Sequence, residues 1–233
     1  VKALTLLQKM AVAKSVFRAE PWRLNLAVTN RCNSRCIMCD VWSKPQENEL
    51  SAEEFSPLFD YFPNLTWLHI TGGEPFLKPN LVYFVDRAIE LCPKLAVVDF
   101  ATNGFLPDSI SQTMEKIVEE HPSTLFEVGV SMDGRQLKHE IMRGVECWHK
   151  IQATWNLLRD LSHRYGNFKL HANFAITPFN LGELRCFCQE FPFIAPISIS
   201  LYHVGHSFAN EYQAHWASHD FYRRAQEDIA LFL

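Results

Sequence analysis

Short apolar runs rich in β-branched and aromatic residues alternate along the chain with amphipathic stretches. The apolar runs predict six strands, at residues 24–29, 66–71, 96–102, 125–132, 169–177 and 197–204. The amphipathic stretches predict helices at residues 51–62, 81–92, near 108–120, near 145–164, near 181–190 and near 218–232. Ser51 and Glu54 form a capping box at the start of the first predicted helix.

This alternation predicts an α/β fold of six βα units with parallel strands. The strands look apolar on both faces, which is typical of strands buried between helix layers. Six units are too few to close an eight-stranded TIM barrel, so the candidates are a partial, open (β/α)6 TIM-like barrel and a doubly wound sheet. No stretch rich in Gly, Ser or Pro interrupts the pattern. We therefore expect a lead-in helix at residues 1–23 and one core domain at residues 24–233.

The composition excludes several classes of function. The net charge is −4, and no block of lysine or arginine suggests binding to nucleic acid. No apolar run is long enough to cross a bilayer, and we expect no membrane contact. Seven cysteines, without a secretory signal, do not indicate a disulfide framework, so we expect a reducing cytoplasm.

Three of the cysteines lie within eight residues, directly after the first predicted strand. Cys32, Cys36 and Cys39 have the spacing C-x3-C-x2-C. Thiolates are soft ligands that suit iron–sulfur clusters, zinc or copper(I), and a structural zinc site needs four ligands. The other cysteines lie in or beside predicted helices. A cubane cluster held by three cysteines would leave one iron open to a substrate or cofactor.

Unusual loop sequences follow the next three strands as well: "TGGEP" at 71–75, "ATNG" at 101–104 and "SMDG" at 131–134. In parallel α/β folds, ligands bind at the carboxyl ends of the strands. We therefore expect these loops and the cysteine loop to converge on one site.

The cysteine spacing, followed in order by "GGEP" (72–75), "TNG" (102–104) and "SMDG" with "HEIMRG" (139–144), resembles the radical S-adenosylmethionine (radical SAM) superfamily. The likeness is to its subgroup of peptide-modifying and cofactor-maturing enzymes. It implies that the three cysteines hold a 4Fe–4S cluster, whose open iron chelates S-adenosylmethionine. It also implies reductive cleavage to a 5′-deoxyadenosyl radical, which abstracts hydrogen from a peptide or small-molecule substrate. The electron would come from a donor such as flavodoxin or ferredoxin.

The resemblance also implies roles for the glycine-rich loop. Gly72 and Gly73 would let the backbone approach the methionine moiety, where a Cβ would intrude. Glu74 would supply a carboxylate to the cofactor's ammonium group. The alternative for this loop is a tight turn between strand and helix.

The remaining candidates are single residues. Asn103 would bind a ribose hydroxyl or a carboxylate, and Ser131 and Arg143 would bind the cofactor's carboxylate. Each has the alternative of a turn residue or a surface charge. Met38 stands where the family usually has an aromatic residue against the adenine, and methionine can pack on a ring. Asp133 is expected to cap the turn before Gly134.

Other functions remain open at this point. The chain could be a non-catalytic metal-binding module, either a zinc-stabilised fold or an iron–sulfur electron carrier, although a carrier needs no "GGEP" loop. It could also be a degenerate member that binds S-adenosylmethionine without cleaving it. His203 and His206 could touch substrate. An auxiliary cluster built from Cys147, Cys186 and Cys188 would require helices to unwind, and we do not expect one. Many members of the subgroup carry a cysteine-rich C-terminal extension, which is either truncated from this sequence or lacking in this member.

Overall fold

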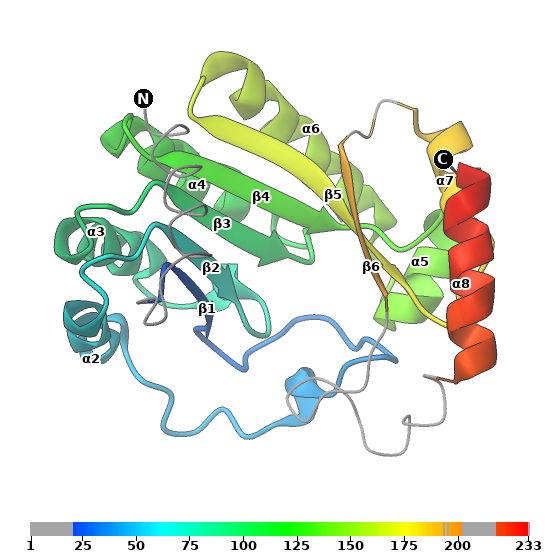
Figure 1. Cartoon of the computed structure of the whole chain (residues 1–233), viewed down its shortest axis with the longest axis horizontal. Helices are drawn as coiled ribbons and strands as arrows, with labels where there is room; N and C mark the ends of the chain where they lie inside the picture. The colour runs from blue at the N-terminus through cyan, green and yellow to red at the C-terminus, as the bar shows by residue number, and fades with distance from the viewer. Residues whose placement is uncertain (1–20, 193, 195, 202–217, 233) are drawn as a thin grey trace, which may run out of the picture.

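The computed structural model describes residues 21–192, 194, 196–201 and 218–232. Its centre is a six-stranded parallel sheet in the order β1-β2-β3-β4-β5-β6, which curls into part of a barrel (Figure 1). The strands are β1 Arg23–Ala27, β2 Trp67–Thr71, β3 Val97–Thr102, β4 Leu125–Ser131, β5 Phe168–Ile176 and β6 Ile197–Leu201. The order follows the sequence without the reversal that defines a doubly wound sheet, so the partial TIM-like barrel is confirmed.

Helices cover one side of this sheet and one of its ends. Helices α3, α4 and α6 lie behind the sheet in Figure 1, and α7 packs against α8 beside β6. The helices are α2 Ala52–Phe55, α3 Leu81–Leu91, α4 Pro107–Glu120, α5 Gln136–Arg143, α6 Trp148–Arg164, α7 Glu183–Glu190 and α8 His219–Phe232. Three 3₁₀ turns complete the set: η1 Val41–Ser43, η2 Ser56–Tyr61 and η3 Pro75–Leu77. Among the described residues, no helix combines the length and apolar character that crossing a bilayer requires.

The helix predicted at 51–62 is only one α-helical turn followed by the 3₁₀ segment η2. The capping box is present, because Ser51 accepts a hydrogen bond from the Glu54 backbone and the Glu54 carboxylate accepts one from the Ser51 N–H. Pro57 has no backbone N–H to continue the α-helical ladder. The Ser56 hydroxyl instead donates to the carbonyl of Ala52, at 3.0 Å.

Helix α5 was not predicted as a helix, because its apolar pattern is inverted. Leu137 and Ile141, one turn apart, are 74 % and 53 % exposed. The buried positions on this helix are His139 and Met142. The usual apolar stripe facing the core is therefore missing from its sequence.

The core lies on the outer side of the sheet, between strands and helices. In β5 the side chains alternate strictly: Phe168, Leu170, Ala172, Phe174 and Ile176 are buried. Lys169, His171 and Asn173 point to the inner side and are exposed or half-buried. The expectation that the strands are apolar on both faces is therefore wrong for β5, because no described helix covers the inner side.

Candidate active site

One pocket lies at the carboxyl ends of the first four strands, as the loop sequences predict. It is bordered by the cysteine loop, by the ends of β2, β3 and β4, and by the last residue of α5. All the residues predicted to bind cluster or cofactor border this pocket except Glu74: Cys32, Cys36, Met38, Cys39, Gly72, Gly73, Asn103, Ser131 and Arg143. The convergence of the four loops is thus a property of the fold.

The glycine-rich loop after β2 is bound directly to the cysteine loop after β1. The N–H groups of Gly73 and Glu74 donate to the carbonyls of Thr29 and Arg31, both at 2.7 Å. A Cβ at Gly73 would overlap the Arg31 carbonyl, and Gly72 has φ +131°. The two glycines are therefore required for the contact that positions the cysteine loop, whether or not they also leave room for a ligand.

Two of the three thiols contact polar neighbours on the cysteine loop and just after β3. Cys36 is buried, with its Sγ 3.0 Å from the Ser34 hydroxyl. The Cys32 Sγ lies 3.8 Å from the amide nitrogen of Asn103. Burial raises the pKa of Cys32, and it raises that of Cys39 to about 11. Because thiolates bind metal, loading this site would release protons.

Glu74 connects the β2 loop to the β3 loop instead of facing the pocket. Its carboxylate accepts hydrogen bonds from the Thr102 hydroxyl at 2.9 Å, from the Asn103 N–H at 2.7 Å and from the Phe76 N–H at 3.2 Å. The residue is fully buried, and this burial raises its pKa to about 7. Its oxygens are therefore engaged within the protein.

Three other residues predicted to bind the cofactor differ in the contacts that they already make within the protein. The Asn103 amide donates to Asn33 Oδ1 at 2.7 Å, and its oxygen accepts from the Phe105 N–H. The Ser131 hydroxyl borders the pocket without a hydrogen-bond partner among the described residues. Met38 is half-buried against the core at the edge of the pocket.

Arg143 reaches the pocket from the end of α5. Its Nη2 pairs with Asp133 Oδ2 at 2.5 Å, and its Nη1 lies 3.5 Å from Cys36 Sγ. Its Nε is buried and has no hydrogen-bond partner in the described structure. Asp133 therefore does more than cap a turn, since its carboxylate also accepts a hydrogen bond from the Ala175 N–H.

Several contributors to the loop were not singled out from the sequence. Glu49 accepts hydrogen bonds from the Thr29 hydroxyl and the Asn30 N–H, so it anchors the start of the cysteine loop. The Trp42 indole donates to the Cys39 carbonyl at 2.8 Å. Trp42, so close after the third cysteine, could have been noticed in the sequence, whereas nothing in the sequence connects Glu49 to this loop.

The secondary candidates do not add to the site. His203 and His206 lie outside the described residues. Cys147 is buried at the start of α6, while Cys186 and Cys188 are on the intact helix α7. None of these three cysteines borders the pocket that the other three thiols line.

Comparison with known proteins agrees with this geometry. A family model described as the radical SAM superfamily matches residues 26–170. The chain belongs to this superfamily. Proteins of this superfamily bind a 4Fe–4S cluster and S-adenosylmethionine.

Curated relatives of this radical SAM superfamily member include GTP 3′,8-cyclases. The protein from Desulforamulus reducens is 28 % identical over 142 residues, which are 58 % of this chain and 41 % of the relative. A probable GTP 3′,8-cyclase from Archaeoglobus fulgidus is 37 % identical over 138 residues, with 57 % and 42 % covered. The chain thus spans about two fifths of the length of these relatives.

Two solved structures share the fold of this chain. Streptococcus suis SuiB bound to S-adenosylmethionine superposes with a TM-score of 0.64 at 18 % identity, covering 98 % of this chain and 52 % of SuiB. The enzyme anSMEcpe with bound AdoMet gives a TM-score of 0.63 at 18 % identity, covering 90 % of this chain and 59 % of that one.

The donor set of the pocket fits a cluster better than a single metal ion. A structural zinc site is closed by four protein ligands. Three thiols border the pocket, and no histidine or carboxylate is among the described residues that line it. The unpartnered Arg143 Nε is in addition suited to an anionic ligand group.

Proposed function

We propose that Cys32, Cys36 and Cys39 hold the 4Fe–4S cluster and that S-adenosylmethionine occupies the rest of the same pocket. The observation that carries this proposal is the convergence of three thiols, two glycines and a buried arginine on one pocket at the strand ends. When bound and reduced by an external electron donor, the cluster would supply the electron for reductive cleavage of S-adenosylmethionine, the chemistry that starts hydrogen abstraction from a substrate.

The residues around the pocket divide into ligand-binding and positioning groups. Ser131 and Arg143 are free to bind the cofactor's carboxylate, since the hydroxyl and the Nε both lack partners among the described residues. Gly72 and Gly73 border the methionine moiety, and Met38 the adenine. Asn103 holds the Cys32 side of the loop. For Glu74 we propose a positioning role through Thr102 and Asn103, in place of the predicted contact with the ammonium group.

The substrate is proposed to enter the hollow on the inner side of the sheet. Four neighbouring strands present a row of polar side chains there, namely His69, Asp99, Glu127 and Lys169. Asp99 is already hydrogen-bonded to His69 and to the Trp67 indole. Glu127 is half-buried and has no hydrogen-bond partner among the described residues. Burial raises its pKa.

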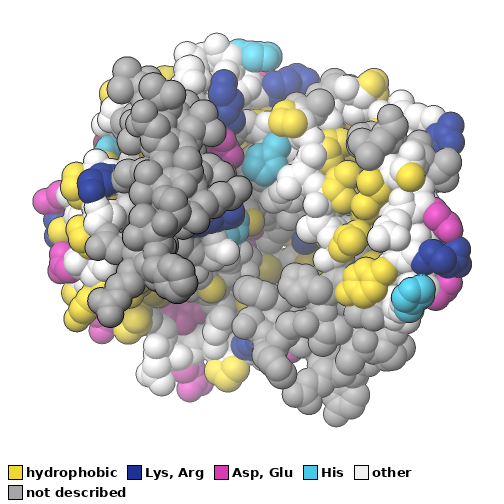
Figure 2. Space-filling model, in the orientation of Figure 1, with side chains coloured by type: hydrophobic (Ala, Val, Ile, Leu, Met, Phe, Trp, Pro, Cys, Tyr) yellow, Lys and Arg dark blue, Asp and Glu magenta, His cyan; other side chains and the backbone are white. Residues whose placement is uncertain are grey.

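This polar lining favours a substrate rich in hydrogen-bonding groups. The face seen in Figure 2 is hollowed near its centre, and basic, acidic and histidine side chains lie close together on it. The curated relatives are named as GTP cyclases, and SuiB has been solved with the precursor peptide SuiA bound. Both GTP and a peptide are polar molecules, but they are of different kinds. We therefore propose a polar small molecule or peptide, with flavodoxin or ferredoxin as the electron donor.

Anaerobic reconstitution tests this function. The protein should take up about four irons and four sulfides. With dithionite, it should then convert S-adenosylmethionine slowly to 5′-deoxyadenosine, which is measured chromatographically after quenching. Alanine at Cys32, Cys36 or Cys39 should abolish both properties. Cys186→Ala is the matched control and should change neither, because that thiol lies on α7 and does not border the pocket.

Two other results would contradict the proposal in distinguishable ways. Stoichiometric zinc without sulfide, after oxygen-free purification and reconstitution, would exclude the cluster. A loaded and reduced cluster that yields no 5′-deoxyadenosine would show a member that binds the cofactor without cleaving it.

A further inference from the structure

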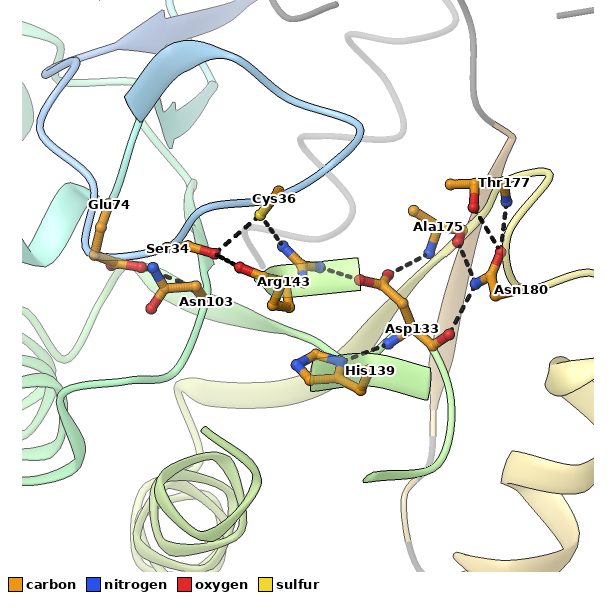
Figure 3. A network of polar contacts seen from close by, with 10 residues as sticks. All are labelled: Ser34, Cys36, Glu74, Asn103, Asp133, His139, Arg143, Ala175, Thr177 and Asn180. Atoms are coloured by element: carbon orange, nitrogen blue, oxygen red, sulfur yellow. Dashed lines mark hydrogen bonds and ion pairs between the residues drawn. The ribbon is translucent and has the colours of Figure 1, made fainter. Parts of the chain in front are cut away.

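A buried ion pair stands directly beside one of the cluster cysteines (Figure 3). Asp133 is fully buried, and the Arg143 side chain is only 11 % exposed. Their groups pair at 2.5 Å, and Arg143 Nη1 lies 3.5 Å from the sulfur of Cys36. An arginine guanidinium stays protonated in proteins, so the pair places a fixed positive charge beside this sulfur.

Asp133 is hydrogen-bonded from several sides, through its backbone and through its carboxylate. Its N–H donates to His139 Nδ1 and its Oδ1 accepts from the Ala175 N–H, both at 3.0 Å. Its carbonyl accepts from the Asn180 amide at 2.8 Å, and the same amide donates to the Ala175 carbonyl. Figure 3 shows this network running from the end of β5 to Cys36. The carboxylate is thus held at the end of β4 with the guanidinium between it and the sulfur.

The backbone ties the same elements together. The Arg143 carbonyl accepts hydrogen bonds from the Arg35 N–H at 2.9 Å and from the Ser34 hydroxyl at 3.1 Å. A movement of Arg143 would therefore displace the loop between Cys32 and Cys36. The residue that carries the guanidinium is therefore tied to the loop that carries Cys36.

A positive charge and an N–H group beside a cluster sulfur stabilise the reduced, more negative state of a cluster. Hydrogen bonds to the sulfurs and net charge are among the main determinants of the reduction potential of iron–sulfur clusters. A carboxylate behind the guanidinium opposes this effect, because it partly cancels the positive charge in a site of low dielectric. The two members of the pair thus act in opposite directions.

We propose that Asp133 and Arg143 together set the reduction potential of the cluster through Cys36, with Arg143 raising it and Asp133 limiting the rise. This inference rests on the proposed cluster at Cys32, Cys36 and Cys39. It concerns a one-electron couple in which the cluster gains an electron from the external reductant and no bond forms or breaks. Asp133 is accordingly a positioning residue, which acts through Arg143.

The test is a potentiometric titration of the reconstituted cluster, followed by electron paramagnetic resonance without S-adenosylmethionine. Arg143→Met removes the charge and should shift the midpoint potential downward. Asp133→Asn keeps the shape of the side chain, leaves the arginine charge uncompensated and should shift the potential upward. Arg143→Lys keeps the charge without the guanidinium, and its potential should lie between wild type and Arg143→Met.

Arg135→Met is the matched control. Arg135 forms an ion pair with Glu183 at 2.9 Å, but that pair is on the surface and Arg135 does not border the pocket. The midpoint potential of the cluster in Arg135→Met should equal that of wild type. Circular dichroism of each variant without metal checks that the fold is retained.

A structural role alone would give a different pattern. Shifts of the same sign in Asp133→Asn and Arg143→Met, or no shift in either, would overturn the inference. So would failure of both Arg143 variants to hold a cluster, because it would assign the arginine to assembly of the loop. If wild type itself takes up no iron and sulfide, the proposed function fails instead.

Discussion

Glu74→Gln isolates the energetic effect of a carboxylate that is buried between two loops of the site. The pKa of Glu74 is about 7 in the folded protein, against 4.5 for the ordinary side chain. The folded state therefore binds the proton more tightly than the unfolded state does. The stabilisation that the raised pKa of Glu74 gives the folded state is fully present below about pH 4.5 and is lost as the pH rises towards about 7.

The magnitude follows from this difference in pKa. One pKa unit corresponds to about 1.4 kcal/mol, and about 2.5 kcal/mol of the free energy of unfolding should be lost between about pH 5 and about pH 8. Glutamine does not titrate, so the variant should lack this loss. It will be less stable at low pH, because its amide nitrogen cannot accept from the donors of Thr102, Asn103 and Phe76.

The assay is anaerobic urea denaturation of the metal-free protein at several pH values. The difference in unfolding free energy between wild type and Glu74→Gln cancels the titration of all groups that the two proteins share. This difference should narrow by about 2.5 kcal/mol from about pH 5 to about pH 8. A difference that stays constant across this range would refute the assignment of a raised pKa to buried Glu74.

Two further changes probe the loop contact and the core. Gly73→Val should lower the iron content, and it should lower the binding of S-adenosylmethionine measured by equilibrium dialysis, because a Cβ at this position overlaps the Arg31 carbonyl. Gly166→Ala is the control and should leave both quantities unchanged, because a Cβ there meets no other atom within 4 Å. Full iron loading of Gly73→Val would show that the contact between the loops is dispensable. Phe174→Ala should cost about 3–5 kcal/mol in urea denaturation because the ring is fully buried, whereas Leu137→Ala, which is 74 % exposed, should cost less than about 0.5 kcal/mol.

The fold is largely predictable because its strands and most of its helices have patterns that depend on local sequence. All six strands occur near the predicted residues, and the strands follow one another in the sheet as they do in the sequence. Helix α5 could not be found this way, since its buried face consists of His139 and Met142 rather than an apolar stripe. The inner side of β5 was also misjudged, because sequence alone does not show which face a helix layer covers.

The site divides along similar lines. Cysteine spacing and glycine loops are local signals, and the structure places them at one pocket. The partners of these residues are distant in sequence, and local patterns do not predict them. The Glu74 carboxylate accepts hydrogen bonds from Thr102 and Asn103, which lie 28 and 29 residues later in the sequence. Glu49 accepts one from Thr29, which lies 20 residues earlier. The pairing of Asp133 with Arg143 likewise depends on how α5 packs.

The alternation of side chains along β5 also separates two kinds of evolutionary constraint. Phe168, Leu170 and Phe174 point into the core, where a change of volume lowers stability. His171 and Asn173, between them in the sequence, face the hollow and contribute little to that packing. If the substrate binds in the hollow as proposed, substitutions at these inner positions would alter which molecule binds there while the strand stays folded. A lineage could change its substrate through a few residues of this kind, with the core and the cysteine loop left as they are.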